Sequence, residues 1–296
     1  ADYGRKDLPF ATALQMVNND HISPLFAAAA DVLKAVAKAP QGVVVLPGLD
    51  LDLAADAMVN AGFGSAGERC MAISVAVAVG DIADDLVAKI TERAQTIKTG
   101  DGTKDSDMGP LVTKAHRDKV ASYVDAGEAA GATVVLDGRQ VQPDGGGASE
   151  TTADVTGGFW LGPTLFDHVT PDMSIYTDEI FGPVLCIVRA KDYEDALRLP
   201  TEHEYGNGVA IFTQDGDAAR DFTARVNVGM VGINVPIPVP VAYHTFGGWK
   251  RSGFGDLNQH GPASIQFYTK VKTVTARWPD SDLEHADSSF VIPTMG

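Results

Sequence analysis

Hydrophobic positions between Val43 and Pro240 follow two alternating patterns. Short runs rich in β-branched residues, typical of buried strands, are separated by longer stretches in which apolar residues recur at helical spacing. The predicted strands are Val43–Leu46, Ile73–Val79, Thr133–Leu136, Val184–Val188, Gly208–Phe212 and Met230–Val235. The predicted helices are Leu51–Asn60, Ile82–Ile97, Lys114–Ala130, Asp192–Leu199 and Asp217–Val226, several of them opened by Asp, Ser or Thr in a capping position. This order predicts an α/β domain with a mostly parallel sheet.

The chain before this domain has a different pattern. Residues 1–42 contain a predicted helix from Ser23 to Ala37, which is opened by a Ser-Pro pair and closed by Pro40. This helix carries no residues with evident chemistry. Within the domain, residues Pro143 to Gly158 are rich in Gly, Thr and Ser and contain no basic residue, which predicts a surface loop and not a phosphate site.

Residues 241–296 form a closing segment after the domain at 43–240. They contain a glycine-punctuated stretch, a short predicted helix near Pro262 to Phe267, and a β-branched run from Lys272 to Arg277. A strand that follows a complete domain needs a free sheet edge to pair with. We expect this run to add to the sheet of a second subunit, in a homodimer or higher homo-oligomer.

Composition and charge exclude several classes of partner. The 296 residues contain 39 acidic and 23 basic side chains, and this formal charge of −16 repels nucleic acids and anionic membranes. No stretch approaches the roughly 18 apolar residues of a membrane helix. The first residues lack the basic segment and apolar run of a secretory signal, so a cytoplasmic location is expected. Two cysteines without a Cys/His cluster predict neither a disulfide framework nor a zinc site.

The string from Gly62 to Gly67 satisfies the G-x-G-x-x-G pattern of dinucleotide-binding loops. That function requires a strand before the glycines and a helix after them, so that the helix N-terminus faces the pyrophosphate. Here a predicted helix comes first and a predicted strand follows. We interpret the glycines as a tight loop that holds Glu68, Arg69 and Cys70 at a strand mouth, where ligands of open α/β sheets bind.

The two cysteines have different surroundings. A lone cysteine is most often a small buried hydrophobe, and Cys186, inside an apolar strand-like run, fits that interpretation. Cys70 lies in the glycine-rich loop directly after Arg69, whose positive charge favours the nucleophilic thiolate. The sequence therefore predicts that Cys70 is the reactive thiol.

Several segments occur in the order found in a known family. They are Ala66-Gly-Glu-Arg-Cys-Met-Ala72, Asp107-Met-Gly-Pro-Leu111, Asp178-Glu-Ile-Phe-Gly-Pro183, Tyr205-Gly-Asn-Gly208, Gly232-Ile-Asn-Val-Pro-Ile-Pro-Val-Pro240 and Phe246-Gly-Gly-Trp-Lys-Arg-Ser252. From about Val43 to Pro279 the chain resembles the aldehyde dehydrogenase superfamily, most of all its methylmalonate-semialdehyde dehydrogenase branch. The resemblance implies an aldehyde-dehydrogenase-type catalytic domain followed by an oligomerisation strand.

The resemblance also implies roles for five residues. Cys70 matches the nucleophile that attacks the aldehyde; hydride then leaves to NAD, and the acyl group passes from the thioester to coenzyme A with loss of carbon dioxide. Arg69 matches the arginine that binds the substrate carboxylate, and Phe246 matches a wall of the substrate pocket. Glu179 and Phe181 match the pair beside the nicotinamide ribose and ring. Structural roles stay open for all but the nucleophile: a surface ion pair for Arg69, a cap for Glu179 and core packing for both phenylalanines.

The N-terminal part departs from the family pattern. Only 42 residues precede Val43, which is too short for the family's Rossmann-type cofactor domain, so binding of NAD by this chain alone is doubtful. Three hypotheses stay open. The chain is a truncated or split oxidoreductase whose cofactor domain comes from a second polypeptide, or a cofactor-independent cysteine enzyme acting on an aldehyde or acyl thioester, or a non-catalytic scaffold. The intact Glu-Arg-Cys loop argues against the scaffold.

Overall fold

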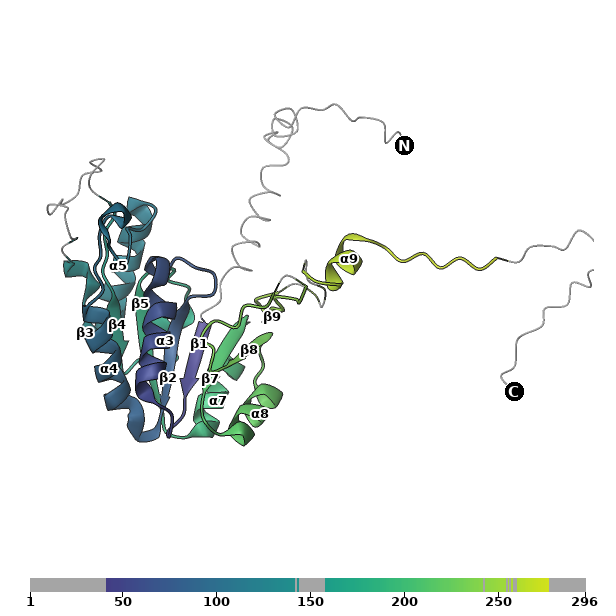
Figure 1. Ribbon diagram of the computed structural model, residues 1–296, viewed down its shortest axis with the longest axis horizontal. Coiled ribbons are helices and arrows are strands. Elements are labelled where there is room, and N and C mark those ends of the chain that lie inside the picture. Colours follow the sequence, from purple (N-terminus) through teal and green to yellow (C-terminus); the bar gives the residue numbers. More distant parts are fainter. Residues whose placement is uncertain are drawn as a thin grey trace, which may run out of the picture.

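The computed structural model describes residues 41–141, 143, 158–241, 243–253, 255, 257 and 260–276. Within these residues, seven strands form one sheet with helices on both faces (Figure 1). In chain order the strands are β1 (Gln41–Val45), β2 (Ile73–Val79), β3 (Thr133–Leu136), β4 (Thr164–Asp167), β5 (Val184–Ala190), β7 (Gly208–Phe212) and β8 (Met230–Ile233). Their spatial order is β3-β4-β5-β2-β1-β7-β8, and every neighbouring pair is parallel except β3 with β4. The mostly parallel α/β sheet is as predicted.

Two layers of helices cover the sheet. Helices α3 (Leu51–Phe63) and α4 (Ala83–Gln95) share one hydrophobic cluster with one face. Helices α5 (Lys114–Ala129), α6 (Ser174–Thr177), α7 (Tyr193–Glu202) and α8 (Gly216–Arg225) pack on the other. Outside these layers lie α9 (Ala263–Tyr268) and a small antiparallel pair, β6 (Tyr205–Gly206) with β9 (Trp249–Lys250). No helix in the described ranges is long and apolar enough to cross a membrane.

Strand β2 shows how the sequence builds two cores. Val75, Val77 and Val79 belong to the cluster with α5 to α8, whereas Ala76 and Ala78 belong to the cluster with α3 and α4. Alternate side chains of a strand point to opposite faces, so the valines fill one layer and the alanines the other. The central position of β2, between β1 and β5, buries both faces.

The helix starts follow the capping residues seen in the sequence. Asp50, Thr113, Asp192 and Asp215 each accept a hydrogen bond from a backbone N–H in the first turn of α3, α5, α7 and α8. Such caps satisfy donors that have no partner inside the helix. Asp192 was expected inside its helix and instead caps it.

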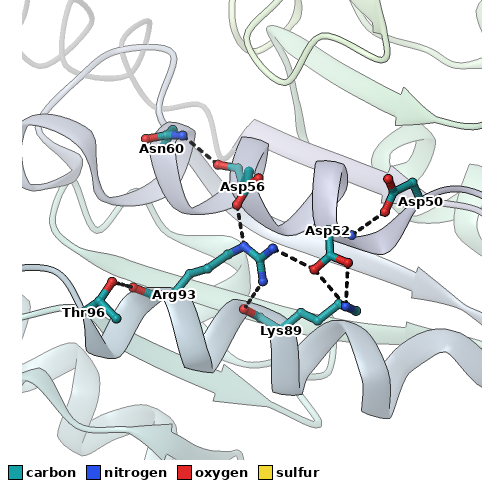
Figure 2. A network of polar contacts seen from close by, with 7 residues as sticks. All are labelled: Asp50, Asp52, Asp56, Asn60, Lys89, Arg93 and Thr96. Carbon is teal, nitrogen blue, oxygen red and sulfur yellow. Dashed lines mark hydrogen bonds and ion pairs between the residues drawn. The ribbon is translucent and has the colours of Figure 1, made fainter.

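Polar contacts also join α3 to α4 across their outer surfaces (Figure 2). Asp52 of α3 accepts hydrogen bonds from Lys89 Nζ at 2.8 Å and from Arg93 Nη2 at 2.7 Å. Arg93 Nε donates to Asp56, one turn further along α3. Exposed pairs of this kind contribute little to stability one at a time. Arg93 thus bridges Asp52 and Asp56 on the outer face of α3, the helix that leads into the cysteine loop.

The structure differs from the sequence-based prediction in a few places. Strand β4 was not predicted: its four residues are buried on both faces and therefore show no alternation. Strand β1 begins at Gln41, inside the predicted N-terminal segment, and β8 ends at Ile233, before the predicted end at Val235. The predicted helix Ser23–Ala37 and nearly all of the loop 143–158 lie outside the described residues.

The C-terminal run was predicted to be a strand. Residues 270–276 form no strand in this chain, and Val271 and Val274 are 91% and 75% exposed. The yellow segment in Figure 1 extends away from the domain after α9. Pairing of this run with a second subunit stays a prediction.

Candidate active site

The loop between α3 and β2 carries Cys70. It begins with a short 3-10 turn at Gly64–Gly67, in which Ser65, Ala66 and Gly67 have φ values of 54°, 54° and 69°. Consecutive left-handed residues reverse the chain tightly. The chain then places Cys70 at the surface. The predicted order, with a helix before the glycines and a strand after them, is confirmed, so this string does not form a dinucleotide-binding turn.

Cys186 has the opposite environment. It lies in the middle of β5, is fully buried, and its Sγ contacts the Ile175 carbonyl oxygen at 3.5 Å. Burial raises the pKa of the Cys186 thiol to about 12. Its thiolate is therefore absent at neutral pH, as expected for a core residue.

A second loop, residues 178–183, leads into β5 and lies beside the cysteine loop. Because β2 and β5 are parallel neighbours, the segments that precede them emerge at the same end of the sheet. The two loops touch at their backbones: a Cβ on Gly67 would lie 2.1 Å from the Gly182 carbonyl oxygen. The neighbouring Phe181 is left-handed, with φ of 58°.

A narrow pocket forms where the two loops meet. Its lining includes Arg69 and Cys70 from the first loop, and Glu179, Phe181 and Gly182 from the second. Four of the five residues singled out in the sequence therefore share one pocket. An exposed thiol, a cation and an aromatic ring at one surface opening form a group that could bind a small polar substrate.

The pocket lies at the amino ends of β2 and β5. The cysteine loop was predicted to lie where ligands of open α/β sheets bind, which by the general rule is the carboxyl end of the strands. That expectation was wrong. The helix-before-strand order that excludes a dinucleotide turn also puts the loop ahead of its strand and hence at the opposite end.

Arg69 makes contacts that the sequence did not indicate. Its Nη2 donates to the carbonyl oxygens of Asn60 at 2.8 Å and of Ala61 at 3.3 Å, in the last turn of α3. The guanidinium lies over Gly64, where a Cβ would stand 2.5 Å from Nη2. A cation at a helix C-terminus interacts favourably with the unpaired carbonyls and the helix dipole. Arg69 Nε is buried and has no hydrogen-bond partner among the described residues.

Phe246 is not among the residues that line this pocket. Its ring packs on His260, with centroids 4.6 Å apart. The segment that carries it is nevertheless tied to the cysteine loop, because Trp249 pairs with Gly206 and the neighbouring Asn207 donates to the Met71 sulfur at 3.3 Å. A substrate-wall role for Phe246 stays a prediction.

One further residue, which no motif indicated, contacts both loops. His116 in the first turn of α5 has Nε2 at 2.7 Å from the Phe181 carbonyl oxygen and at 3.5 Å from Glu68 Oε1. Sequence reasoning missed it because a histidine three residues after a capping threonine has no distinguishing pattern. Within the described ranges, no group of His, Cys, Asp and Glu side chains is arranged to hold a metal ion.

Comparison with known proteins shows which family the chain belongs to. The sequence model of the aldehyde dehydrogenase family matches residues 28–274, which extends further toward the N-terminus than the motifs did. The chain belongs to the aldehyde dehydrogenase family. It is 52% identical over 265 residues to the malonate-semialdehyde dehydrogenase of Pseudomonas aeruginosa, a match that covers 89% of this chain and 51% of the relative.

Solved structures place the chain in the same branch of the family. A putative methylmalonate-semialdehyde dehydrogenase from Sinorhizobium meliloti, solved with NAD, matches with a TM-score of 0.77 and 54% identity. The methylmalonate-semialdehyde dehydrogenase of Oceanimonas doudoroffii matches with a TM-score of 0.75 and 52% identity. Each match covers 82% of this chain and 48% of the solved chain. The chain thus spans about half the length of the relatives that it matches.

Proposed function

We propose that this chain carries the cysteine-bearing part of an aldehyde dehydrogenase that acts on malonate semialdehyde or a similar carboxylated aldehyde. The observation that carries the proposal is the shared pocket of Arg69, Cys70, Glu179 and Phe181. Relatives named malonate-semialdehyde dehydrogenases, 52% to 40% identical, support the substrate class.

Cys70 supplies the nucleophile in this proposal. Its thiolate attacks the carbonyl carbon, a C–S bond forms, and the carbonyl oxygen takes the electron pair to give a thiohemiacetal anion. When that oxygen re-forms the C=O bond, hydride leaves the carbon for an acceptor, which bound NAD would supply, and a thioester remains on Cys70. The exposed position of the thiol suits the first step, because the substrate reaches it without displacing the core.

Arg69 provides the cation for the substrate carboxylate. Its Nη2 donates to carbonyl oxygens at the end of α3, which holds the guanidinium beside the Cys70 pocket. A guanidinium fixed at one nitrogen retains other N–H donors for a carboxylate. Anchoring also lowers the conformational entropy lost when the substrate binds.

The described residues fit part of an NAD molecule. Glu179 and Phe181 lie in the Cys70 pocket, where they would hold the ribose and nicotinamide ring, and NAD when bound supplies the hydride acceptor. The turn at Gly62 to Gly67 does not fit the pyrophosphate, because a helix precedes it and a strand follows. We propose that most of the NAD contacts, and those to coenzyme A, lie outside the described residues.

Acylation of Cys70 tests the proposal without requiring NAD. The chain is incubated with 4-nitrophenyl acetate, which transfers its acetyl group to an accessible thiolate and releases nitrophenolate, and the adduct is located by mass spectrometry. We expect acetylation of Cys70 that is lost in Cys70→Ser and retained in Cys186→Ala. Acetylation of Cys186 in place of Cys70, or equal labelling of both, would overturn the assignment.

A further inference from the structure

One face of helix α5 contacts the loop of residues 178–183 at three points. His116 Nε2 lies 2.7 Å from the Phe181 carbonyl oxygen, Val120 lies under Gly182, and the Tyr123 hydroxyl donates to Asp178 at 3.0 Å. Positions 116, 120 and 123 share one face because they are separated by four and three residues. The helix thus follows the loop along its length.

His116 differs from the other two because it also contacts the cysteine loop. Its Nε2 lies 3.5 Å from Oε1 of Glu68, two residues before Cys70. The same carboxylate oxygen accepts a long hydrogen bond, 3.4 Å, from the Val112 N–H. The side chains of His116 and Glu68 are 22% and 12% exposed, so both contacts are largely shielded from solvent.

The chemistry of the imidazole fixes its role at this position. Because a carbonyl oxygen only accepts hydrogen bonds, Nε2 must carry the hydrogen that it donates to Phe181. The same Nε2 lies 3.5 Å from the Glu68 carboxylate, which attracts its partial positive charge. Phe181 is left-handed, a conformation that is unfavourable for a bulky residue without support from its surroundings, and its carbonyl is the group that this bond contacts.

We propose that His116 is a positioning residue of the Cys70 pocket, which fixes the cysteine loop relative to the Phe181 loop through Glu68 and the Phe181 carbonyl. The inference rests on the proposed function in so far as the pocket is the active site. It assigns a role to a residue that touches neither the thiol nor the proposed substrate.

Hydrogen exchange tests the positioning role directly. In His116→Leu we expect amide exchange to accelerate about fivefold in both loops, residues 65–72 and 178–184, since one hydrogen bond is lost between them. His116→Gln, whose amide carries a donor near the position of Nε2, restores protection. Tyr123→Phe is the matched control from the same helix face, because it should loosen residues 178–184 and leave 65–72 unchanged.

A pair of reagents separates this role from general stabilisation. We expect His116→Leu to lower the rate of Cys70 acetylation by 4-nitrophenyl acetate about fivefold relative to its alkylation by iodoacetamide, since acetylation depends more on the pocket. Lys114→Leu is the control and should leave the ratio unchanged, because Lys114 pairs with Asp118. If His116→Leu does not fold, His116→Asn, with a donor too short to reach Phe181, replaces it.

The outcomes are distinguishable. Unchanged exchange in both loops of His116→Leu, or equal acceleration in His116→Gln, would overturn the positioning role. Absence of Cys70 acetylation in the unmodified chain would refute the proposed function, while the exchange measurement would still decide whether His116 joins the loops.

Discussion

The backbones of Gly67 and Gly182 are in direct contact, so that a Cβ added to Gly67 would lie 2.1 Å from the Gly182 carbonyl oxygen. Gly67 also has a φ of 69°, which side-chain-bearing residues rarely adopt. The contact joins the loop that carries Cys70 to the loop that carries Phe181. Two reasons therefore require glycine at this position.

Gly67→Ala should destabilise the protein by about 2 kcal/mol or more, because the clash and the backbone strain add. Urea denaturation measures the change in the free energy of unfolding. Gly216→Ala is the matched control, since a Cβ there meets no atom within 4 Å. Equal stability of the two variants would show that contact between the Gly67 and Gly182 loops does not contribute to the free energy of unfolding.

Gly64→Ala tests the position of Arg69. The backbone of Gly64, with φ of −54° and ψ of 135°, accommodates alanine, but the new Cβ would stand 2.5 Å from Arg69 Nη2 and displace the guanidinium. We expect the rate of Cys70 alkylation by iodoacetate, relative to iodoacetamide, to fall about threefold, because the anionic reagent loses a nearby cation. Arg69→Gln should give the same fall. If the ratio falls in Arg69→Gln and not in Gly64→Ala, the effect of the guanidinium does not depend on its position over Gly64.

Lys250→Met should destabilise the protein by about 1 to 3 kcal/mol, because it leaves carbonyl groups without a donor. Lys250 Nζ donates to the carbonyl oxygens of Pro200, Thr201 and His203 at 2.8 to 3.1 Å, and so closes the end of α7. Thermal unfolding measures the effect, with Arg251→Met as control. Arg251 pairs with Glu204 at the surface, and its loss should change stability much less.

The lowered pKa of His203 should make the stability of the protein depend on pH. Burial, with a further contribution from the nearby Lys250, lowers its pKa, and its Nδ1 accepts from the Tyr205 N–H at 3.1 Å. In the window between the unfolded value of about 6.5 and the lower folded value, the unfolded chain binds more protons, so stability falls as the pH falls. The free energy of unfolding of His203→Leu should decrease less over this window. Parallel curves for the two proteins would contradict the prediction.

Calorimetry with NAD tests the proposal that most of the NAD contacts lie outside the described residues. We expect the 296-residue chain to give no heat of binding at about millimolar NAD, because the two residues that we propose for the cofactor, Glu179 and Phe181, would contact only its nicotinamide end. Affinity in the micromolar range would mean that this chain, alone or as an oligomer, builds the whole site. If NAD does not bind, turnover of an acyl thioester that depends on Cys70 would favour the cofactor-independent alternative.

Much of the fold was predictable from local signals. Helices α3, α5, α7 and α8 follow capping residues and helical periodicity, and β2, β3 and β7 have the predicted bounds. Strand β4 was missed because burial on both faces removes the alternation that distinguishes a short strand. Its antiparallel pairing with β3 was likewise not predicted, because the residue pattern of a short strand does not indicate its partner or its direction.

The candidate site was predictable only in part. Motifs indicated Arg69, Cys70, Glu179 and Phe181, which do share a pocket. They gave no sign of His116, whose role arises from helix α5 packing against a loop 65 residues further along the chain. The predicted end of the sheet was wrong, because the cysteine loop precedes β2, whereas the rule for parallel sheets concerns loops that follow their strands.

Both loops that carry the pocket continue without interruption into β2 and β5, two interior strands of the sheet. Hinge motions are absorbed by loop or element-terminal residues, and the strand side of each loop is fixed in the interior of the sheet. Changes in the shape of the pocket would therefore come from the side chains of Glu179 and Phe181, because Arg69 is held by the end of α3. Exchange of these side chains, with the backbone left in place, is the route by which this scaffold can be redirected to a new substrate.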